Sequence, residues 1–424
     1  MLNSYEYKKI DESYFSFTMP NGLQVFYIPR PNYKKSFAVF STDFGGIDFK
    51  TDLMTLPPGI AHFLEHKLFE NPNGNVEDDF SKLGISVNAF TTHNNTSYYI
   101  SCTSNFYEGL ELLLDFVQTP YFTDQNVKKE QGIIAQEIEM YRDDANWVGY
   151  LNLLNGLYPN HPINKDIAGA KDDILQVDVD MLNETFGQYY NPLNMALFVI
   201  GDIDIERLYE FVAENQQKKK FEEAPKYQRN FKQDEFIPNE KKVSIDMEIS
   251  RNILNFGFKD KQVEEAGKEL FEKEITTLLG LETLVGKSSK LYNDLYENRI
   301  IDDSFSIEYT TETGYGHTIF SCETEDPMKT YSILKERFQE AVNQGLDEED
   351  FIVNKRKIQG ITLMELNSLE NVVLGFMGEH FRGGRFFDKN EIIEKITFEK
   401  VEKRIKEHLD FKMSALSVVN NKAR

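Results

Sequence analysis

The 424-residue sequence predicts an α+β protein built from two copies of one sheet-plus-helix unit. The chain is longer than the size at which a single hydrophobic core stops growing, so more than one domain is expected. Strand-like and helix-like segments follow one another without the regular alternation of a parallel α/β fold, which favours the α+β class. Three short sequence matches also recur in the same order in both halves, which indicates a duplicated domain.

The recurring matches link one segment in each half to a similar segment in the other. The pairs are Ile100–Cys102 with Phe320–Cys322, Gln131–Ile133 with Gln359–Ile361, and Met195–Ile200 with Met413–Val419. Each match is short, and it is their common order and similar offset that carry the inference. We therefore predict two homologous domains, over residues 1–215 and 237–424, joined by a charged and polar linker over residues 216–236.

Within the first half, local composition predicts both strands and helices. β-branched and aromatic residues are concentrated in four strand-like runs, at Leu23–Ile28, Ser36–Ser41, Ser97–Cys102 and Met195–Ile200. Apolar residues recur at helical spacing in two longer runs, at Tyr107–Val117 and Val127–Tyr141. Together these elements predict a sheet with helices packed on it.

Composition argues against two classes of partner and favours a reducing compartment. The formal net charge is −23, and a surface this acidic repels nucleic acid and anionic membranes. Two cysteines, Cys102 and Cys322, are too few for a disulfide framework or a cysteine zinc cluster. The N-terminus lacks an apolar signal core, and no stretch is apolar enough to span a bilayer. We therefore expect a cytoplasmic protein with neither a nucleic acid nor a membrane as partner.

The segment Gly59–Glu70 carries the strongest chemical signal in the sequence. Prolines precede it and an Asn-Pro-Asn-Gly stretch follows it, so a short helix is expected. On that helix His62 and His66 are four residues apart and face the same way, so both imidazoles can bind one zinc ion. Glu65 lies near the same face, where it can reach the attacking water without binding the metal. This is the His-x-x-Glu-His order of an inverted zinc-peptidase motif; the plainer alternative is an amphipathic helix with two surface histidines.

A catalytic zinc needs a third protein ligand and an open position for water. The best source is the acidic helix-like segment that contains Glu130 and Glu137, which are two helical turns apart on one face. One of these carboxylates can bind the metal while the other forms a hydrogen bond to a ligand or to the substrate. The segment taken alone is typical of a solvated acidic face, but the incomplete two-histidine site favours the functional interpretation.

At these residues the chain resembles the pitrilysin/insulinase family of zinc peptidases, peptidase family M16, over nearly its whole length. It is most similar to bacterial two-domain subunits of the processing-peptidase type. The resemblance implies that Glu137 is the third zinc ligand and that Glu130 assists catalysis. It also implies two homologous domains that form a clam-like half shell, with metal in only one copy. The second copy has Ile275–Glu282 near the corresponding place, without a histidine.

The same resemblance implies a substrate-binding role for Asn88, Ala89, Phe90 and Thr91. In the family this segment forms an edge strand beside the zinc, to which a peptide adds as a further strand. An exposed edge offers unpaired backbone groups that hold an extended peptide whatever its side chains. An ordinary sheet strand is the alternative for these four residues taken alone.

Many family members also place an arginine and a tyrosine from the second half over the substrate carbonyl. This chain has Tyr309 and Tyr315 in the corresponding region, and Arg299 lies nearby without the expected spacing. Either a partner subunit supplies the pair, or this chain works differently. A homologous second subunit in a heterodimer would supply the pair; a homodimer is the other possibility.

We predict a zinc metalloendopeptidase that hydrolyses short or unfolded peptides, with Glu65 passing a proton from the attacking water to the leaving amine. The main alternative is a non-catalytic zinc-binding or core subunit of a peptidase-like heterodimer. A nucleotide-binding role, suggested by Val285–Ser289, is rejected because Leu281 stands where a phosphate loop needs glycine. The other histidines lack ligand spacing and are interpreted as structural or exposed: His93, His161, His317, His380 and His408.

Overall fold

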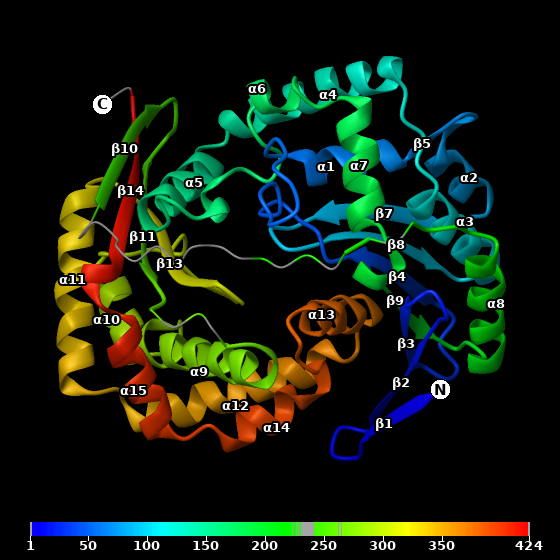
Figure 1. The fold of residues 1–424 in the computed structure, drawn as a ribbon. Coiled ribbons are helices and arrows are strands. Elements are labelled where there is room, and N and C mark those ends of the chain that lie inside the picture. Colours follow the sequence, from blue (N-terminus) through cyan, green and yellow to red (C-terminus); the bar gives the residue numbers. More distant parts are fainter. Residues whose placement is uncertain are drawn as a thin grey trace. The chain divides into compact units, whose positions relative to one another are not determined.

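The computed structural model divides into two compact units, each built around one β-sheet (Figure 1). It describes residues 2–222, 224–225, 227, 229, 241–261, 263 and 265–422. The first unit comprises Met1–Glu139, Lys165–Asn230 and Leu366–Met377, and the second comprises Met140–Asn164, Phe231–Glu365 and Gly378–Arg424. Each half of the sequence therefore contributes one helical segment to the unit formed mainly by the other half.

The domain boundaries expected from the sequence stay a prediction. The predicted linker over residues 216–236 and the start of the predicted second domain fall partly on residues 230–240, which lie outside the described residues. The predicted fold class is confirmed, because both units combine helices with a sheet.

A seven-stranded sheet forms the centre of the first unit, with the strand order β1-β2-β3-β9-β4-β8-β7. Its strands are β1 Asn3–Tyr7, β2 Glu12–Thr18, β3 Gln24–Pro29, β4 Ser36–Thr42, β7 Ser86–Thr91, β8 Thr96–Cys102 and β9 Met195–Gly201. Neighbouring strands are antiparallel except β3 and β9, which are parallel. All four strands predicted from the sequence are present at nearly the expected bounds. β7 ends the sheet at one edge.

Helices cover both faces of this sheet. They are α1 Ile60–Leu68, α2 Val76–Lys82, α3 Phe106–Gln118, α4 Asp124–Arg142, α6 Lys171–Ile174, α7 Val179–Tyr189, α8 Ile205–Gln217 and most of α13 Leu369–Phe381. The short elements are β5 Glu70–Asn71, β6 Gly74–Asn75 and the 3-10 turn η2 Pro192–Asn194. The two predicted helices are confirmed as α3 and α4.

The two faces are separated by the alternation of side chains along β3. Val25 and Tyr27 point into the main core of the first unit, where α3 packs. Phe26 points the other way and lies against Phe376 of α13, with ring centroids 5.6 Å apart. Phe376 also contacts Tyr14 on β2 at 4.8 Å. A helix from the second half of the sequence therefore closes one face of the first sheet.

The second unit repeats the strand topology of the first. Its sheet has the order β10-β14-β11-β13-β12. The strands are β10 Lys241–Met247, β11 Asn252–Lys259, β12 Ser306–Glu312, β13 Tyr315–Thr324 and β14 Ser414–Asn421. One parallel pair, β10 with β14, is followed by three antiparallel pairs, as in the run β3-β9-β4-β8-β7. The predicted duplication is confirmed, and β12 corresponds to the edge strand β7.

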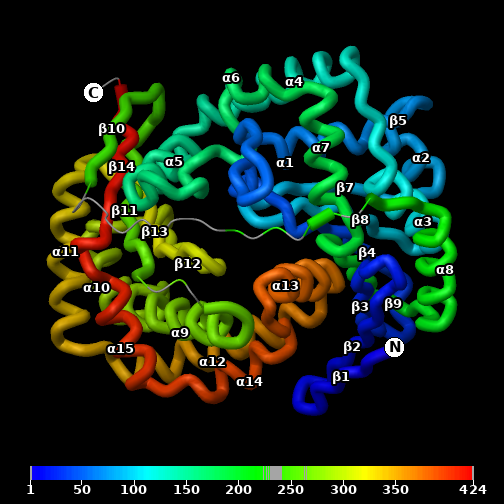
Figure 2. Tube along the Cα trace, in the orientation of Figure 1, coloured from blue at the N-terminus to red at the C-terminus, as the bar shows by residue number. Residues whose placement is uncertain are grey.

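The helices of the second unit include α5, which comes from the first half of the sequence. They are α5 Ala145–Leu157, α9 Gly267–Val285, α10 Lys290–Glu297, α11 Pro327–Gln344, α12 Glu348–Glu365, α14 Lys389–Lys395 and α15 Phe398–His408, with 3-10 turns η1 Pro162–Asn164, η3 Phe386–Asp388 and η4 Phe411–Met413. α5 lies beside β11 and β14, as Figure 2 traces. Gly149 permits this close approach, because a Cβ there would stand 2.5 Å from Asn255 Nδ2.

Arg229, in the segment that follows α8, is anchored on the first unit by a buried ion pair. Its guanidinium donates from Nε and Nη2 to the two carboxylate oxygens of Asp48 at 2.9 and 2.8 Å, and Nη1 lies 2.8 Å from Asp43. Asp48 is fully buried, and its carboxylate also accepts a hydrogen bond from the backbone amide of Gly45. A paired carboxylate at zero exposure requires this cation, since an unpaired buried charge is costly.

Replacing Arg229 with methionine is therefore expected to lower the free energy of unfolding of the first unit by about 3 kcal/mol. The loss arises because Asp48 stays buried without its partner. Chemical denaturation followed by circular dichroism measures the change. Arg337→Met is the control, because Arg337 forms an exposed ion pair with Asp294 and should cost less than about 1 kcal/mol. Equal effects of the two substitutions would contradict the assignment.

Glu379, near the end of α13, is a buried carboxyl with an unusual environment. Its Oε1 accepts from Arg382 at 2.8 Å, while Oε2 is buried without a hydrogen-bond partner among the described residues. Burial raises the pKa of Glu379 to about 7; Arg382 opposes the shift, Glu274 and Glu312 add to it, and Lys389 opposes it. The folded protein therefore prefers the protonated form.

This raised pKa predicts a pH-dependent stability. The folded state holds the Glu379 proton up to about pH 7, whereas the unfolded chain releases it near its ordinary value of 4.5, so stability falls as pH rises through that window. At pH 8, the free energy of unfolding of Glu379→Gln is expected to exceed that of wild type by on the order of 3 kcal/mol. The variant should therefore unfold at a higher temperature. The difference should shrink to less than about 1 kcal/mol at pH 5 and vanish well below the ordinary value of 4.5. Exposed Glu336→Gln is the control, and a gain that is equal at both pH values would refute the titration.

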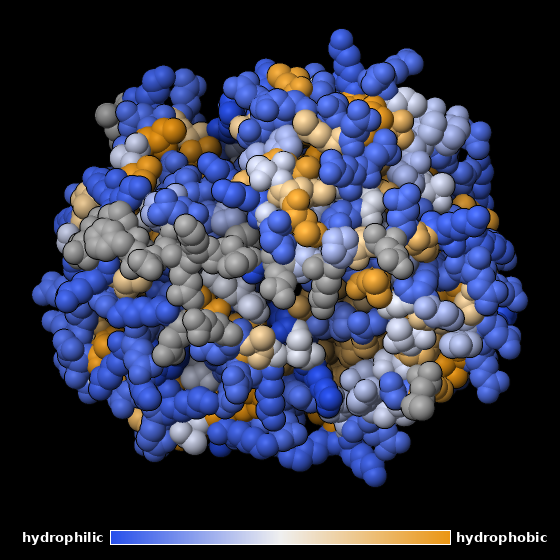
Figure 3. Space-filling view, viewed as in Figure 1, coloured by the Kyte–Doolittle hydropathy of each residue, from blue (hydrophilic) through white to orange (hydrophobic). Residues whose placement is uncertain are grey.

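The surface of the molecule is mostly hydrophilic in the face that Figure 3 shows, with apolar residues in scattered groups. Among the helices of the described residues, none combines the length and the apolar character that crossing a bilayer requires.

Candidate metal centre

Helix α1 presents the two predicted histidines on one side. The chain enters it through Gly59, whose φ of +92° and close approach to the carbonyl of Ala168, 2.4 Å from an added Cβ, leave no room for a side chain. Apolar residues of α1, among them Phe63 and Leu64, pack into the core of the first unit and fix the helix rotation. His62 and His66 are left facing α4, with ring centroids 4.5 Å apart.

Glu137 on α4 completes a three-residue cluster with these histidines. Its Oε1 lies 3.8 Å from His62 Nε2, and its Oε2 lies 3.6 Å from His66 Nε2. One donor atom from each residue lies within 4.8 Å of the other two. Zinc ligands at about 2.0–2.2 Å in tetrahedral arrangement are separated by roughly 3.5 Å, so the residues present fit such an ion.

Glu130, two turns before Glu137 on α4, takes a different place in the cluster. Its Oε1 lies 3.1 Å from Nδ1 of His66, on the opposite side of the ring from Glu137. A carboxylate at this distance accepts the Nδ1 hydrogen and leaves Nε2 as the free donor atom. The side chain is only 7 % exposed. The geometry thus separates the two carboxylates that helical spacing alone left equivalent.

The two imidazoles differ in their proton affinity. Burial, with a smaller contribution from His66, lowers the pKa of His62 to about 3, so this ring is neutral at physiological pH. For His66, burial acts to lower the pKa, but the hydrogen bond to Glu130 and the nearby charges of Glu65, Glu130 and Glu137 outweigh it and raise the value. The Nδ1 atom of His62 is buried without a hydrogen-bond partner among the described residues. A neutral imidazole is the form that binds a metal.

Glu65 lies on α1, and a residue of the sheet forms a hydrogen bond to its carboxylate. Thr91, the last residue of β7, donates its hydroxyl to Glu65 Oε2 at 2.5 Å. The residue is 9 % exposed, and burial is the main cause that raises the pKa of its carboxyl. The hydrogen bond from Thr91 and the charge of His66 oppose this rise, while Glu137 adds to it.

The four residues predicted to bind substrate all lie on β7. The strand pairs only with β8 among the described residues, so its other edge carries no strand there. Asn88 turns its side-chain oxygen onto the amide of Ala89, and Phe90 packs on the ring of Tyr99. Thr91 is the member that the structure links directly to Glu65.

One functional candidate was missed by sequence reasoning. Lys67 follows His66 in α1 and is fully buried, with its ammonium between Glu70 and Glu130. The signal was available in part: a lysine interrupts the buried run Phe63, Leu64 and Leu68. Only the tertiary structure brings Glu130 to it.

The candidate tyrosines of the second unit are engaged elsewhere. Tyr309 on β12 donates its hydroxyl to buried Asp260 at 2.6 Å and accepts from Arg404. Tyr315 is 2 % exposed. Arg299 follows α10 with a φ of +58°. His93 is a partly buried residue outside the ligand cluster, and desolvation lowers its pKa to about 4.

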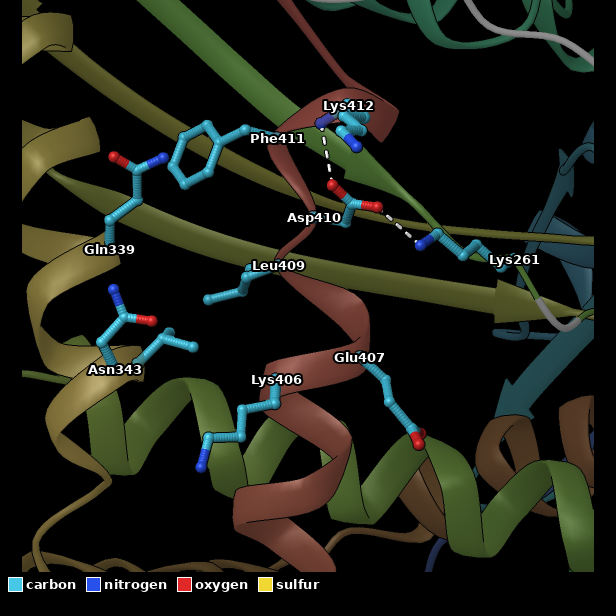
Figure 4. A pocket seen from close by; sticks show the side chains of 10 residues that line it. Lys261, Gln339, Asn343, Lys406, Glu407, Leu409, Asp410, Phe411 and Lys412 are labelled. Carbon is cyan, nitrogen blue, oxygen red and sulfur yellow. Dashed lines mark hydrogen bonds and ion pairs between the residues drawn. The ribbon is translucent and has the colours of Figure 1, made fainter.

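A surface pocket of about 700 Å³ lies in the second unit, between α11, α15 and η4 (Figure 4). Its wall carries Lys261 and Asp410, which form an ion pair at 2.6 Å. None of the predicted site residues lines it. The pocket therefore contributes nothing to the metal centre.

Comparisons with known proteins support a single family. The family model described as insulinase (peptidase family M16) matches residues 56–171, and the one described as peptidase M16 inactive domain matches residues 176–358. YmfH of Bacillus subtilis, named an uncharacterized zinc protease, is 38% identical to this chain. The match covers 96% of this chain and 97% of YmfH. The mitochondrial-processing peptidase subunit beta of Dictyostelium discoideum is 22% identical over 93% of this chain and 86% of its own.

Solved structures agree with these matches. The structure of an M16-like protein from Alicyclobacillus acidocaldarius has a TM-score of 0.91 at 31% identity, and covers 96% of this chain and 98% of its own. A protease from Helicobacter pylori shares the fold, with a TM-score of 0.83 at 17% identity and the same coverage. Relatives named as zinc proteases support a metallopeptidase at the level of the family. The chain belongs to the insulinase family of peptidases, family M16.

Proposed function

We propose that this chain is a zinc metalloendopeptidase in which His62, His66 and Glu137 hold the metal. The observation that carries the proposal is the convergence of their three donor atoms within 4.8 Å, beside the buried carboxylate of Glu65. Two imidazoles and one carboxylate form a usual catalytic zinc set, with a fourth position left for water. The inverted order His-x-x-Glu-His puts the fourth residue on the same helix as both histidines.

In this proposal Glu65 moves the proton. A zinc ion at the site would acidify the attacking water and polarise the scissile carbonyl. Glu65 accepts the water proton and then gives it to the amine as the carbon–nitrogen bond breaks. Thr91 holds Oε2, which leaves Oε1 for the proton. Burial raises the pKa of Glu65, which brings its proton affinity closer to the range that a general base needs.

We assign Glu130 to support of the site rather than to the metal itself. Its hydrogen bond to His66 Nδ1 orients that ring and makes Nε2 the more basic. This contact agrees with the assisting role that the family resemblance implies for the first of the two glutamates.

The proposed substrates are short or unfolded peptides that add to the free edge of β7. Backbone hydrogen bonds from Asn88, Ala89, Phe90 and Thr91 would hold an extended chain with little dependence on its side chains. The link from Thr91 to Glu65 supports this, because it ties the end of the edge strand to the proposed general base.

The proposed partner is a homologous second subunit that supplies an arginine and a tyrosine to the substrate carbonyl. In this chain both candidate tyrosines are committed to the interior of the second unit, Tyr309 through Asp260 and Arg404. A homodimer is the alternative partner. We place the complex in the cytoplasm, where both free cysteines, Cys102 and Cys322, stay reduced.

Metal analysis combined with peptide cleavage tests the proposal. The purified chain should contain one zinc ion, and cleavage of a fluorogenic peptide library, alone or with a homologous subunit, should stop with a chelator and return with zinc. A chain that binds no zinc would overturn the proposal. Zinc binding without cleavage under every condition would favour the alternative, a non-catalytic subunit, which the match to an inactive domain over residues 176–358 keeps in view.

A further inference from the structure

Lys67 is a buried cation in direct contact with the carboxylates around the metal centre. Its side chain has no exposed surface, although it belongs to the residue type that is least often buried. The ammonium lies 2.5 Å from Glu70 Oε2 and 3.8 Å from Glu130 Oε2. An ammonium removed from water must be compensated by such charges.

These contacts form a chain of charges that ends at a proposed ligand. Lys129 donates to Glu70 Oε1 at 3.0 Å from the solvent side, and Glu70 Oε2 accepts from Lys67. Lys67 then faces one oxygen of Glu130, and the other oxygen of Glu130 binds His66 Nδ1. Each carboxylate thereby has a partner at both oxygens, and the contact of Glu130 Oε2 with Lys67 is an ion pair at 3.8 Å. The two lysines differ sharply in exposure, since the Lys129 side chain is 66% exposed.

The geometry fixes the orientation of Glu130. This carboxylate is free to rotate about its last bond unless both oxygens have partners, and His66 occupies only one of them. Lys67 is the cation that the second oxygen faces. With Lys67 in place, Oε1 is directed to His66 Nδ1, and the His66 ring keeps Nε2 toward Glu137.

We propose that Lys67 is a positioning residue of the metal centre, which raises the affinity for zinc by holding Glu130 on His66. The inference rests on the proposed function, because it takes His66 as a ligand. Positioning and a plain charge effect predict opposite changes in zinc affinity when Lys67 is removed. A cation near the site repels Zn²⁺, so removal of a charge alone strengthens metal binding, whereas loss of positioning weakens it.

The test measures metal affinity rather than activity. Zn²⁺ affinity is determined by competition with a chromophoric chelator, and the absorption spectrum of the Co²⁺-loaded protein reports the ligand geometry. Lys67→Met is expected to bind Zn²⁺ about tenfold more weakly than wild type and to shift the Co²⁺ spectrum. Lys129→Met is the matched control, since it removes an exposed lysine of the same network and should leave both readouts unchanged.

A double-mutant cycle separates positioning from a general structural role. If Lys67 acts through Glu130, the effect of Lys67→Met on affinity disappears in the Glu130→Gln background. A structural role instead gives additive losses. Additive losses, or an affinity that is unchanged or increased in Lys67→Met, would overturn the inference.

A second variant keeps the test usable if Lys67→Met does not fold. Lys67→Met combined with Glu70→Gln removes one positive and one negative charge, so fewer unpaired carboxylates remain in the interior. It should show the same tenfold loss. The wild-type measurement distinguishes the two levels: no metal in wild type contradicts the proposed function, whereas tight metal in both wild type and this variant contradicts only the role of Lys67.

Discussion

Replacing Glu65 with glutamine is expected to slow peptide hydrolysis about a thousandfold while the metal stays bound. Glutamine keeps the size of the side chain and can still accept the hydrogen bond from Thr91 through its amide oxygen. It cannot accept a proton from the attacking water. General-base catalysis contributes about 10²–10⁴-fold to such reactions, so kcat should fall by about a thousandfold.

The control for this variant is Glu139→Gln. Glu139 is an exposed residue of α4, two positions after Glu137, and the substitution removes the same charge without touching the cluster. Its kcat and zinc content should match wild type. Zinc is measured in all three proteins by mass spectrometry. Full activity of Glu65→Gln would remove this residue from the mechanism, and loss of zinc in that variant would mean that Glu65 helps to bind the metal.

How well the sequence predicts this site depends on the distance along the chain between the residues that meet there. His62, Glu65 and His66 share one helix, so helical periodicity alone brings them to one face. Glu130 and Glu137 belong to a helix far along the chain, and periodicity could not decide which one meets the histidines. That choice depends on how α4 packs against α1, which leaves Glu137 beside both Nε2 atoms and Glu130 beside His66 Nδ1.

The same distinction applies to the fold. The strands and helices of the first half were predictable because the local sequence pattern determines them. The duplication was predictable because matching segments recur in both halves. The exchange of α5 and α13 was not, because a helix's own sequence shows that it has an apolar face but not which sheet that face will meet. Lys67 illustrates the limit for a single residue. Its burial is explained by Glu70 nearby and by Glu130 from a distant segment.

Replacing His62 with alanine is expected to lower zinc affinity by about a thousandfold, the second large effect. Structural zinc sites bind with about 10–16 kcal/mol shared among their ligands, so one ligand contributes several kcal/mol. His62 is well prepared for this role, since burial keeps its ring neutral and its Nε2 lies near Glu137. The affinity is measured by chelator competition on the purified chain.

His93→Ala distinguishes loss of a ligand from loss of a partly buried ring. Burial lowers the pKa of both His62 and His93, and both are histidines of the first unit, but only His62 belongs to the ligand cluster. Each substitution removes one imidazole ring and its packing contacts, so a similar change in thermal stability is expected. Zinc affinity should fall in His62→Ala alone. Equal loss of zinc in both variants would mean that the metal depends on packing of the first unit rather than on coordination by His62.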